Sequence, residues 1–302
     1  MAEQKAFALY LGCLAPHRYP QIEKATRFLL EKMGYRIAEM ERAACCPAPG
    51  VLRSFNKFDW MVAGARNICI AEKQGVDLIT VCNGCFGTLI DINKHLKKDE
   101  AARAEVNEKL KLLGDYEFQG TINVRHIAEF LAVEIGPYEI EDYLVRKIHG
   151  NVAIHYGCHF LKPPEVREID DPENPVILED FIEALGLKSL DFRDKLTCCG
   201  AGGGIKAAYA ETSMTVFGAK MENIDEVKPD FILDICPFCH LQFETGQDYL
   251  NKNHETNYDY PVLHLSQITA YCMGMDEKFV GLQYQQMGKE YKLNSVEVES
   301  SE

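Results

Sequence analysis

Apolar and polar residues alternate in blocks along this chain, and the blocks predict alternating strands and helices. Short apolar runs typical of buried strands occur at FALYLGC (7–13), VDLITVC (76–82), VAIHYGC (152–158) and DFILDIC (230–236). Residues 22–34 instead repeat apolar residues every three or four positions, as at Ile22, Ala25 and Leu29, which is the spacing of one helix face. Gly34 supplies a helix end.

The same order of elements occurs twice. Residues 175–186 repeat the helical pattern of residues 22–34, and the segments 126–136 and 264–274 each start with a histidine and end with a glycine. Each copy reads as strand, helix, strand, Cys-Cys turn, helix, strand, CxxC, helix and final helix. This alternation predicts an α/β fold of two tandem repeats, each a mostly parallel Rossmann-like sheet flanked by helices.

The boundary between the repeats is predicted near residue 148. The first unit then spans residues 1–148 and the second spans residues 149–284. Residues 285–302 form a polar, acidic tail, which we expect to be disordered or bound by a partner. Each copy is longer than the other in one place. The extra residues of the first copy are expected in the polar stretch 97–120 and those of the second in 161–175. Insertions in such loops would leave a site shared by both copies unchanged.

Cysteines mark the duplication most clearly. Ten of the twelve occur as a single cysteine, a vicinal pair and a CxxC in each copy: Cys13, Cys45, Cys46, Cys82 and Cys85, then Cys158, Cys198, Cys199, Cys236 and Cys239. They lie at or just after the C-terminal ends of predicted strands, the edge at which open parallel sheets bind ligands. Cys69 and Cys272 lie outside the pattern, in apolar helical stretches, and are expected in the core.

Five cysteines in each copy are more than a zinc ion needs. A structural zinc site takes four ligands, commonly from two CxxC pairs, whereas each copy has one CxxC. Vicinal side chains diverge, so they reach two metal atoms of a cluster more easily than one small ion. A cubane iron–sulfur cluster would also leave one thiolate over. A polynuclear iron–sulfur centre in each copy is therefore favoured, and a zinc-stapled scaffold stays open as an alternative.

Glycines follow the second vicinal pair in the segment CCGAGGG, at Gly200, Gly202, Gly203 and Gly204. Without a Cβ atom, such a backbone can approach bulky sulfide atoms closely. Its amides can also donate hydrogen bonds to sulfur. A phosphate-binding loop is disfavoured, because the motif GxxxxGK[ST] is absent from the sequence.

Charge and composition argue against two classes of protein, those that bind nucleic acid and those that span a membrane. The net charge of −14 argues against nucleic acid as the main partner. No apolar run approaches the roughly 18 residues of a membrane span, and the first residues read as a strand instead of a signal peptide. We therefore expect a cytoplasmic protein, in which clustered cysteines bind metal or carry out redox chemistry instead of forming disulfides.

The motifs C-x31-CC-x35-CNGC and C-x39-CCG-x36-CPFC, with LGCLAPHRYP, CCPAPG and CCGAGGG around them, resemble the duplicated cysteine-rich CCG domain. The resemblance is to the heterodisulfide reductase B-subunit family of methanogenic archaea, and it covers residues 1 to about 285. Pro47 replaces the glycine of the motif in the first copy, which changes the loop but removes no thiol.

The resemblance implies a catalytic subunit that reduces the mixed disulfide of coenzyme M and coenzyme B to two thiols. Each domain would bind one non-cubane [4Fe-4S] cluster through its five cysteines, and each cluster would deliver one electron. The implied partners are a small subunit with two cubane [4Fe-4S] clusters and a flavin-containing electron-bifurcating subunit, with hydrogenase or formate dehydrogenase beyond them. The sequence itself has no flavin or nicotinamide motif.

An anionic substrate would need local positive charge. Candidate contacts near the motifs are Lys206, Arg18, His159 and His240. His126 and His264, at matching positions of the two copies, are expected to cap helices by bonding to the backbone, and a supporting role near a cluster is the alternative. The alternative function is that of an iron–sulfur electron-transfer subunit of a hydroxyacid dehydrogenase of the glycolate or lactate type.

Overall fold

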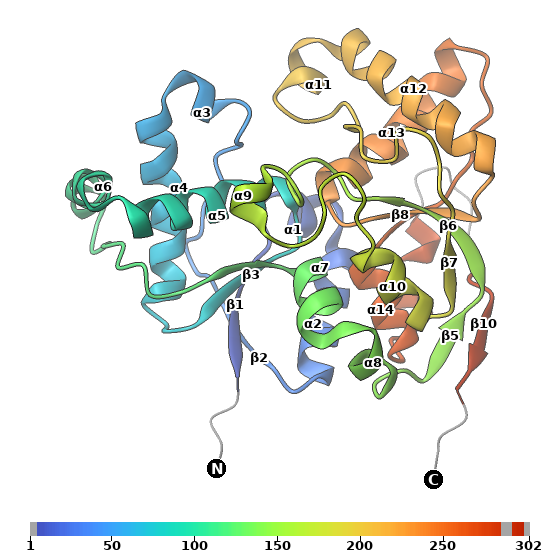
Figure 1. Ribbon diagram of the computed structural model, residues 1–302, viewed down its shortest axis with the longest axis horizontal. Helices are drawn as coiled ribbons and strands as arrows, with labels where there is room; N and C mark the ends of the chain where they lie inside the picture. Colours follow the sequence, from blue (N-terminus) through green and yellow to red (C-terminus); the bar gives the residue numbers. More distant parts are fainter. Residues whose placement is uncertain (1–4, 285–291, 299–302) are drawn as a thin grey trace.

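The computed structural model describes residues 5–284 and 292–298 and consists of two parallel sheets with helices around them (Figure 1). The first sheet contains, in spatial order, β2 (Arg36–Ala38), β1 (Ala6–Tyr10), β3 (Asp77–Thr80) and β4 (Val124–His126). The second contains β7 (Leu187–Ser189), β6 (Gly150–His155), β8 (Phe231–Asp234) and β9 (Val262–His264) in the equivalent order. All pairings within these sheets are parallel, which confirms the predicted fold class.

Helices connect the strands in the predicted alternation. Those of the first repeat are α1 (Leu14–Arg18), α2 (Pro20–Lys32), α3 (Leu52–Phe55), α4 (Lys57–Glu72), α5 (Asn83–Lys98), α6 (Glu100–Leu112), α7 (Ile127–Glu129), the π-helix η1 (Phe130–Ile135) and α8 (Gly136–Glu141). Those of the second are α9 (Pro164–Arg167), α10 (Ile177–Ala184), α11 (Ile205–Ala208), α12 (Ala210–Val227), α13 (Pro237–Asn253), α14 (Leu265–Cys272), α15 (Glu277–Val280) and the 3-10 helix η2 (Leu282–Tyr284).

The fourth strand of each sheet was not predicted from the sequence. Strands β4 and β9 are three residues long, so they give no apolar run of the length that predicts a strand. Each ends on the histidine that the sequence pattern places at the start of the following helix. The fourth strand matters for the site because it places this histidine beside the strand that leads into the CxxC motif.

The two repeats pack into each other instead of standing apart. Helix α14 of the second repeat packs against α2 of the first, and η1 and α8 of the first repeat pack against α10 of the second. The final helices are therefore exchanged reciprocally, as Figure 1 shows for α2 and α14. One hydrophobic core contains buried residues from both repeats, such as Leu29 and Ile268. The largest hydrophobic cluster therefore crosses the predicted boundary at residue 148, and a smaller one, which includes Phe217 and Phe243, lies within the second repeat.

Part of the predicted tail, for which the sequence favours disorder or binding by a partner, has a defined place in the fold. Strand β10 (Ser295–Glu297) pairs antiparallel with β5 (Arg146–Ile148), where the boundary between the repeats is predicted. Leu293 is buried in the common core just before β10. Residues 293–297 therefore pack against β5 and the common core. The rest of the predicted tail, residues 285–291 and 299–302, lies outside the described residues.

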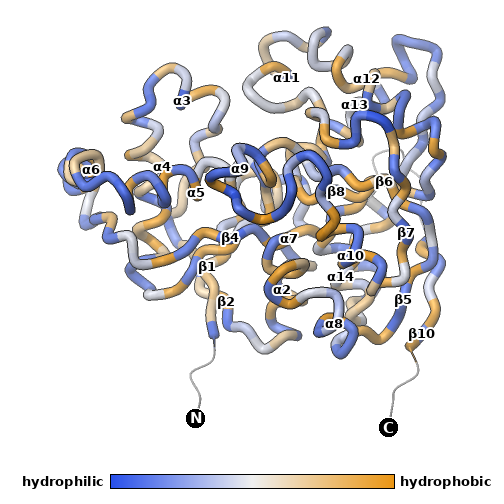
Figure 2. The backbone as a smooth tube through the Cα atoms, in the orientation of Figure 1, coloured by the Kyte–Doolittle hydropathy of each residue, from blue (hydrophilic) through white to orange (hydrophobic). Residues whose placement is uncertain are grey.

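Apolar residues follow the buried elements, and hydrophilic residues follow the outer loops, as around α9 (Figure 2). None of the helices in the described ranges combines the length and the apolar character that crossing a bilayer requires. The two cysteines outside the repeated pattern, Cys69 and Cys272, are fully buried in the core, as predicted.

Candidate metal centre

All ten cysteines of the repeated pattern line one cavity of about 150 Å³. They reach it from equivalent places, because parallel strands of each sheet end at the same edge. Cys13, Cys82 and Cys236 are the N-cap residues of α1, α5 and α13. The predicted clustering of the thiols at the C-terminal strand edges is thus present, and it joins both repeats in a single cavity.

The thiols form one continuous series of neighbours across the molecule. In order of contact, the series is Cys13, Cys45, Cys46, Cys85, Cys82, Cys236, Cys239, Cys199, Cys198 and Cys158. The Sγ atoms of Cys82 and Cys236 are 3.6 Å apart, and those of Cys199 and Cys239 are 3.4 Å apart. From either end, the series runs from the single cysteine through the vicinal pair to the second and then the first cysteine of the CxxC motif. The two sets of five are therefore related by the duplication. They meet at the first cysteines of the two CxxC motifs.

Burial and mutual hydrogen bonding oppose simultaneous ionisation of these thiols. A hydrogen bond with Cys46 raises the pKa of Cys85 well above its ordinary value, and a bond with Cys199 does the same to the pKa of Cys239. Thiolate is the form that binds metal, and crowded buried anions need compensating positive charge. A polynuclear iron–sulfur group fits this donor set, which offers only sulfur ligands along the series.

The glycine loop approaches both the thiols and the other repeat. The Gly200 amide lies 3.3 Å from Cys198 Sγ and donates to it, as predicted for this loop. Gly202 and Gly203 line the cavity. A Cβ atom at Gly50, in the loop after the first vicinal pair, would lie 2.5 Å from the Cα atom of Gly203. The glycines therefore also allow the equivalent loops of the two repeats to touch.

His126 and His264 cap helices, as predicted. The Nδ1 atom of each accepts a backbone hydrogen bond at 3.1 Å, from Ala128 and from Ser266. The Nε2 atom of His264 also lies 3.1 Å from the carbonyl oxygen of Val81 in the other repeat. Because Val81 precedes Cys82, this cap of the second repeat supports the CxxC turn of the first.

Of the candidate substrate contacts, His159 is the one that lines the cavity. Lys206 instead donates to Gln242 Oε1 at 2.6 Å and to Thr245 Oγ1 at 3.1 Å. His240 is buried beneath the site, with Nδ1 2.8 Å from Asp234 Oδ2. Arg18 is exposed at the end of α1, outside the cavity lining. The structure therefore brings one of the four candidates to the thiols.

Two buried polar residues behind the second set of thiols were missed. His155 is the last residue of β6, and one of its ring nitrogens lies within 4.8 Å of the sulfur atoms of both Cys199 and Cys239. Lys220, from α12, is 1% exposed. For His155 the sequence offers one signal, a histidine inside the apolar run VAIHYGC, whereas nothing in the sequence around Lys220 marks this lysine as buried.

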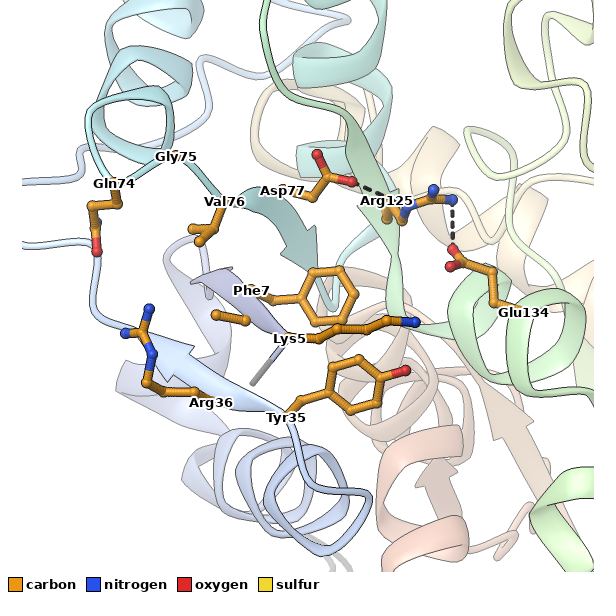
Figure 3. A pocket seen from close by; sticks show the side chains of 11 residues that line it. Lys5, Phe7, Tyr35, Arg36, Gln74, Gly75, Val76, Asp77, Arg125 and Glu134 are labelled. Carbon is orange, nitrogen blue, oxygen red and sulfur yellow. Dashed lines mark ion pairs between the residues drawn. The ribbon is translucent and has the colours of Figure 1, made fainter. Parts of the chain in front are cut away.

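A more open cavity of about 500 Å³ lies at the opposite, N-terminal edge of the first sheet (Figure 3). Its lining includes Lys5, Arg36 and Asp77 and contains no cysteine. The Arg125 guanidinium there pairs with Glu134 at 2.5 Å. This polar cavity is separate from the thiols in the fold.

Comparison with known proteins agrees with the geometry. The family model described as a cysteine-rich domain, CCG, matches residues 7–90 and 152–244. The chain is 44% identical to the B subunit of the ferredoxin:CoB-CoM heterodisulfide reductase of Methanosarcina mazei, over 91% of the chain and 92% of that protein. It is 33% identical to a protein of Archaeoglobus profundus described as like the heterodisulfide reductase B subunit, over 91% of the chain and 93% of that protein.

Two more distant proteins also resemble this chain, one in sequence and one in fold. The chain is 28% identical to the 8-methylmenaquinol:fumarate reductase membrane anchor subunit of Wolinella succinogenes, over 93% of the chain and 96% of that protein. A hypothetical protein from Helicobacter pylori superposes with a TM-score of 0.71 at 18% identity, with 92% of this chain and 51% of that one covered. The duplicated domain, the repeated cysteine pattern and the similarity along nearly the whole length together show that the chain belongs to the heterodisulfide reductase B-subunit family of CCG-domain proteins.

Proposed function

We propose that this chain is the catalytic subunit that reduces the mixed disulfide of coenzyme M and coenzyme B to the two thiols. The main support for this activity is the continuous series of ten thiols, in which two equivalent sets of five meet at Cys82 and Cys236. Each set is one thiolate larger than a cubane cluster needs, so we propose a non-cubane [4Fe-4S] cluster in each repeat, held by these cysteines.

The reaction needs two electrons and two protons for each disulfide. When bound, the two iron–sulfur clusters would supply one electron each, with iron as the acceptor for the thiolate sulfurs. The chain's own residues hold the two centres next to each other, so that one S–S bond can face both. Both electrons enter the S–S bond as it breaks, and each sulfur takes one proton from solvent to leave as a thiol.

Polar residues on the cavity wall have a positioning role in this proposal. His159 follows Cys158 directly and borders the cavity. Its backbone carbonyl accepts a 2.7 Å hydrogen bond from Nε of Arg167, whose side chain is fully buried. Burial, followed by the neighbouring Arg167, lowers the pKa of His159. We propose that this neutral imidazole contacts the substrate.

Electrons must reach the thiol series from another protein, because the sequence has no flavin or nicotinamide motif. The proposed donor is a small subunit with two cubane [4Fe-4S] clusters. Beyond it we propose a flavin-containing electron-bifurcating subunit and a hydrogenase or formate dehydrogenase. A reducing cytoplasm would keep the unliganded thiols Cys69 and Cys272 reduced.

The test is an anaerobic assay of the cluster-loaded chain with a reduced viologen as donor. We expect viologen oxidation when the mixed disulfide of coenzyme M and coenzyme B is added, with two thiols formed for each disulfide consumed. Glycolate and lactate with oxidised viologen test the hydroxyacid dehydrogenase alternative, which the heterodisulfide reductase relatives at 44% and 33% identity do not favour. Turnover of a hydroxyacid without disulfide reduction would overturn the proposal.

A further inference from the structure

The two sets of thiols are symmetric in position, but the polar residues behind them differ in charge. Tyr10 ends β1 three residues before Cys13, and His155 ends β6 three residues before Cys158. Asn67 follows Cys46 by 67 − 46 = 21 residues, and Lys220 follows Cys199 by 220 − 199 = 21 residues. Tyrosine and asparagine in the first repeat thus correspond to histidine and lysine in the second.

The pair in the first repeat forms a closed, neutral set of hydrogen bonds. The Tyr10 hydroxyl donates to the Ala44 carbonyl oxygen at 2.6 Å. The Asn67 side chain accepts from the Ala44 amide at 2.9 Å and donates to the Cys45 carbonyl oxygen at 3.3 Å. These bonds hold the backbone that leads into the first vicinal pair without placing a charged side chain there.

In the second repeat, a buried ammonium group takes the corresponding place. Lys220 Nζ donates to the carbonyl oxygens of Asp194 and Lys195 at 3.2 and 3.0 Å and to Thr197 Oγ1 at 3.3 Å. Among the described residues, no carboxylate lies within ion-pair distance of Nζ. This cation therefore supports the segment before Cys198 and keeps its charge uncompensated by any carboxylate in contact with it.

Three cysteines of the second set, in their thiolate form, would favour the charged form of Lys220. Burial lowers the pKa of Lys220 to about 8, and the largest opposing effects come from Cys199, Cys239 and Cys198, ahead of the Asp194 carboxylate. Lys220 therefore carries a positive charge at pH 7. Asp194 Oδ2 in turn lies 3.3 Å from Asn223 Nδ2, which donates a hydrogen bond to it.

His155 strengthens the same asymmetry. Its ring is 1% exposed and packs edge-on against Phe243, with 5.0 Å between the ring centroids. Neither ring nitrogen has a hydrogen-bond partner among the described residues, and the ring lies beside Cys199 and Cys239. A buried N–H group without a partner is costly, and a sulfur atom of a cluster held by these cysteines would satisfy it.

We infer that Lys220 and His155 make the two centres unequal, so that the centre of the second repeat accepts the first electron from a one-electron donor. This inference rests on the proposed function, because it assumes that each repeat holds one iron–sulfur cluster. One electron leaves the donor and adds one negative charge to the second centre, with no bond broken. A buried cation stabilises that added charge strongly, because the surrounding medium screens it weakly, and N–H donation to sulfur acts in the same direction.

The experiment is a reductive titration of the anaerobic, cluster-loaded chain, followed by paramagnetic resonance. We expect two one-electron steps whose equilibrium constants differ at least tenfold, or about 59 mV. The Lys220→Met change should lower the upper midpoint by at least this tenfold factor and leave the lower one unchanged. Lys220→Arg keeps the charge and should retain the upper midpoint. Lys228→Met, at the exposed end of the same helix, is the matched control and should move neither step.

The assignment to a repeat comes from Cys239→Ser, which should alter the signal of the upper step. Coincident midpoints in the unaltered chain, an upper step assigned to the first repeat, or an equal shift of both midpoints in Lys220→Met would each overturn the inference. If Lys220→Met fails to hold iron, the unaltered chain still shows whether the two midpoints differ, and Cys239→Ser still shows which repeat gives the upper step. The titration contains no disulfide, so its failure would leave the proposed reductase activity untouched.

Discussion

The Sγ atoms of Cys82 and Cys236 lie 3.6 Å apart, although 154 residues separate them in the chain. Each cysteine is the N-cap of the helix that carries the rest of its CxxC motif, α5 or α13. The positive ends of two helix dipoles therefore face the same cavity. Because this contact joins the two sets of thiols, one small substrate bound here can face both repeats at once.

The first prediction concerns metal content. Chain purified without oxygen should hold about eight irons with a similar amount of acid-labile sulfide, since each set of five thiols is proposed to hold four irons. Removing the iron with a chelator should lower the melting temperature, because a ligand bound only by the folded state stabilises it. Iron, sulfide and zinc analysis provides the check. Stoichiometric zinc without sulfide would refute the iron–sulfur assignment.

Both repeats should be needed for turnover. Cys85→Ser and, separately, Cys239→Ser should each damage mainly one centre and lower the rate of disulfide reduction at least ~100-fold, a barrier increase of about 2.7 kcal/mol. The physical reason is that two electrons must reach one disulfide while each centre is proposed to supply one. Iron per folded chain and the rate are measured together.

Cys69→Ser and Cys272→Ser are the matched controls for these substitutions. Both cysteines are fully buried and lie outside the cavity lining. Each serine buries a hydroxyl group, so a loss of about 1–3 kcal/mol of stability is expected, with iron content unchanged. Full reductase activity after loss of either centre would show that the duplication has a structural role alone.

A buried arginine, which also donates a hydrogen bond to the His159 carbonyl oxygen, should hold the two repeats together. The Arg167 side chain is fully buried, and its Nη1 atom lies 2.6 Å from Asp91 Oδ1 on α5. Arg53 Nη1 approaches the other oxygen of the same carboxylate at 3.1 Å, but its side chain is 47% exposed. Arg167→Met should lower the free energy of unfolding by about 3–5 kcal/mol.

Arg53→Met is the matched comparison, because it removes the exposed partner of the same Asp91 carboxylate. Exposed ion pairs contribute about 0–1 kcal/mol, so its effect should be several-fold smaller than that of Arg167→Met. Denaturant unfolding of both variants gives the measurement. Equal losses would mean that burial does not set the strength of this link.

The pH dependence of stability should report a neutral buried histidine. Burial, followed by the nearby His264, lowers the pKa of His126 to about 3, whereas an unfolded histidine titrates near ~6.5. Between these values the unfolded chain binds more protons, so stability must fall as pH decreases through this window. From pH 7.5 to 5.5 the loss should be about 1 kcal/mol for this residue.

His126→Asn provides the comparison, because asparagine can cap the helix and cannot titrate in this range. Its unfolding free energy should fall less than that of the unaltered chain over the same two pH values. Denaturant midpoints at pH 7.5 and 5.5 give the difference. An identical slope in both proteins would assign the pH dependence to other groups.

The duplication, the fold class and the identity of the ten thiols follow from sequence alone. Strand-length apolar runs that end on cysteines carry this information locally, since parallel strands must bring their C-terminal ends to one edge. The regular spacing of Ile22, Ala25 and Leu29 likewise sets the buried face of α2. These features depend on neighbours in the chain, so their pattern survives in the sequence.

The tertiary structure decided the order in which the thiols touch, the exchange of final helices between repeats, and the contrast between Lys220 and Asn67. The three-residue strands β4 and β9 became visible only through pairing. Lys220 reads in the sequence as a surface charge, and burial turns it into a cation near the second set of thiols. Each of these features comes from packing between residues far apart in the chain, for which local periodicity carries no signal.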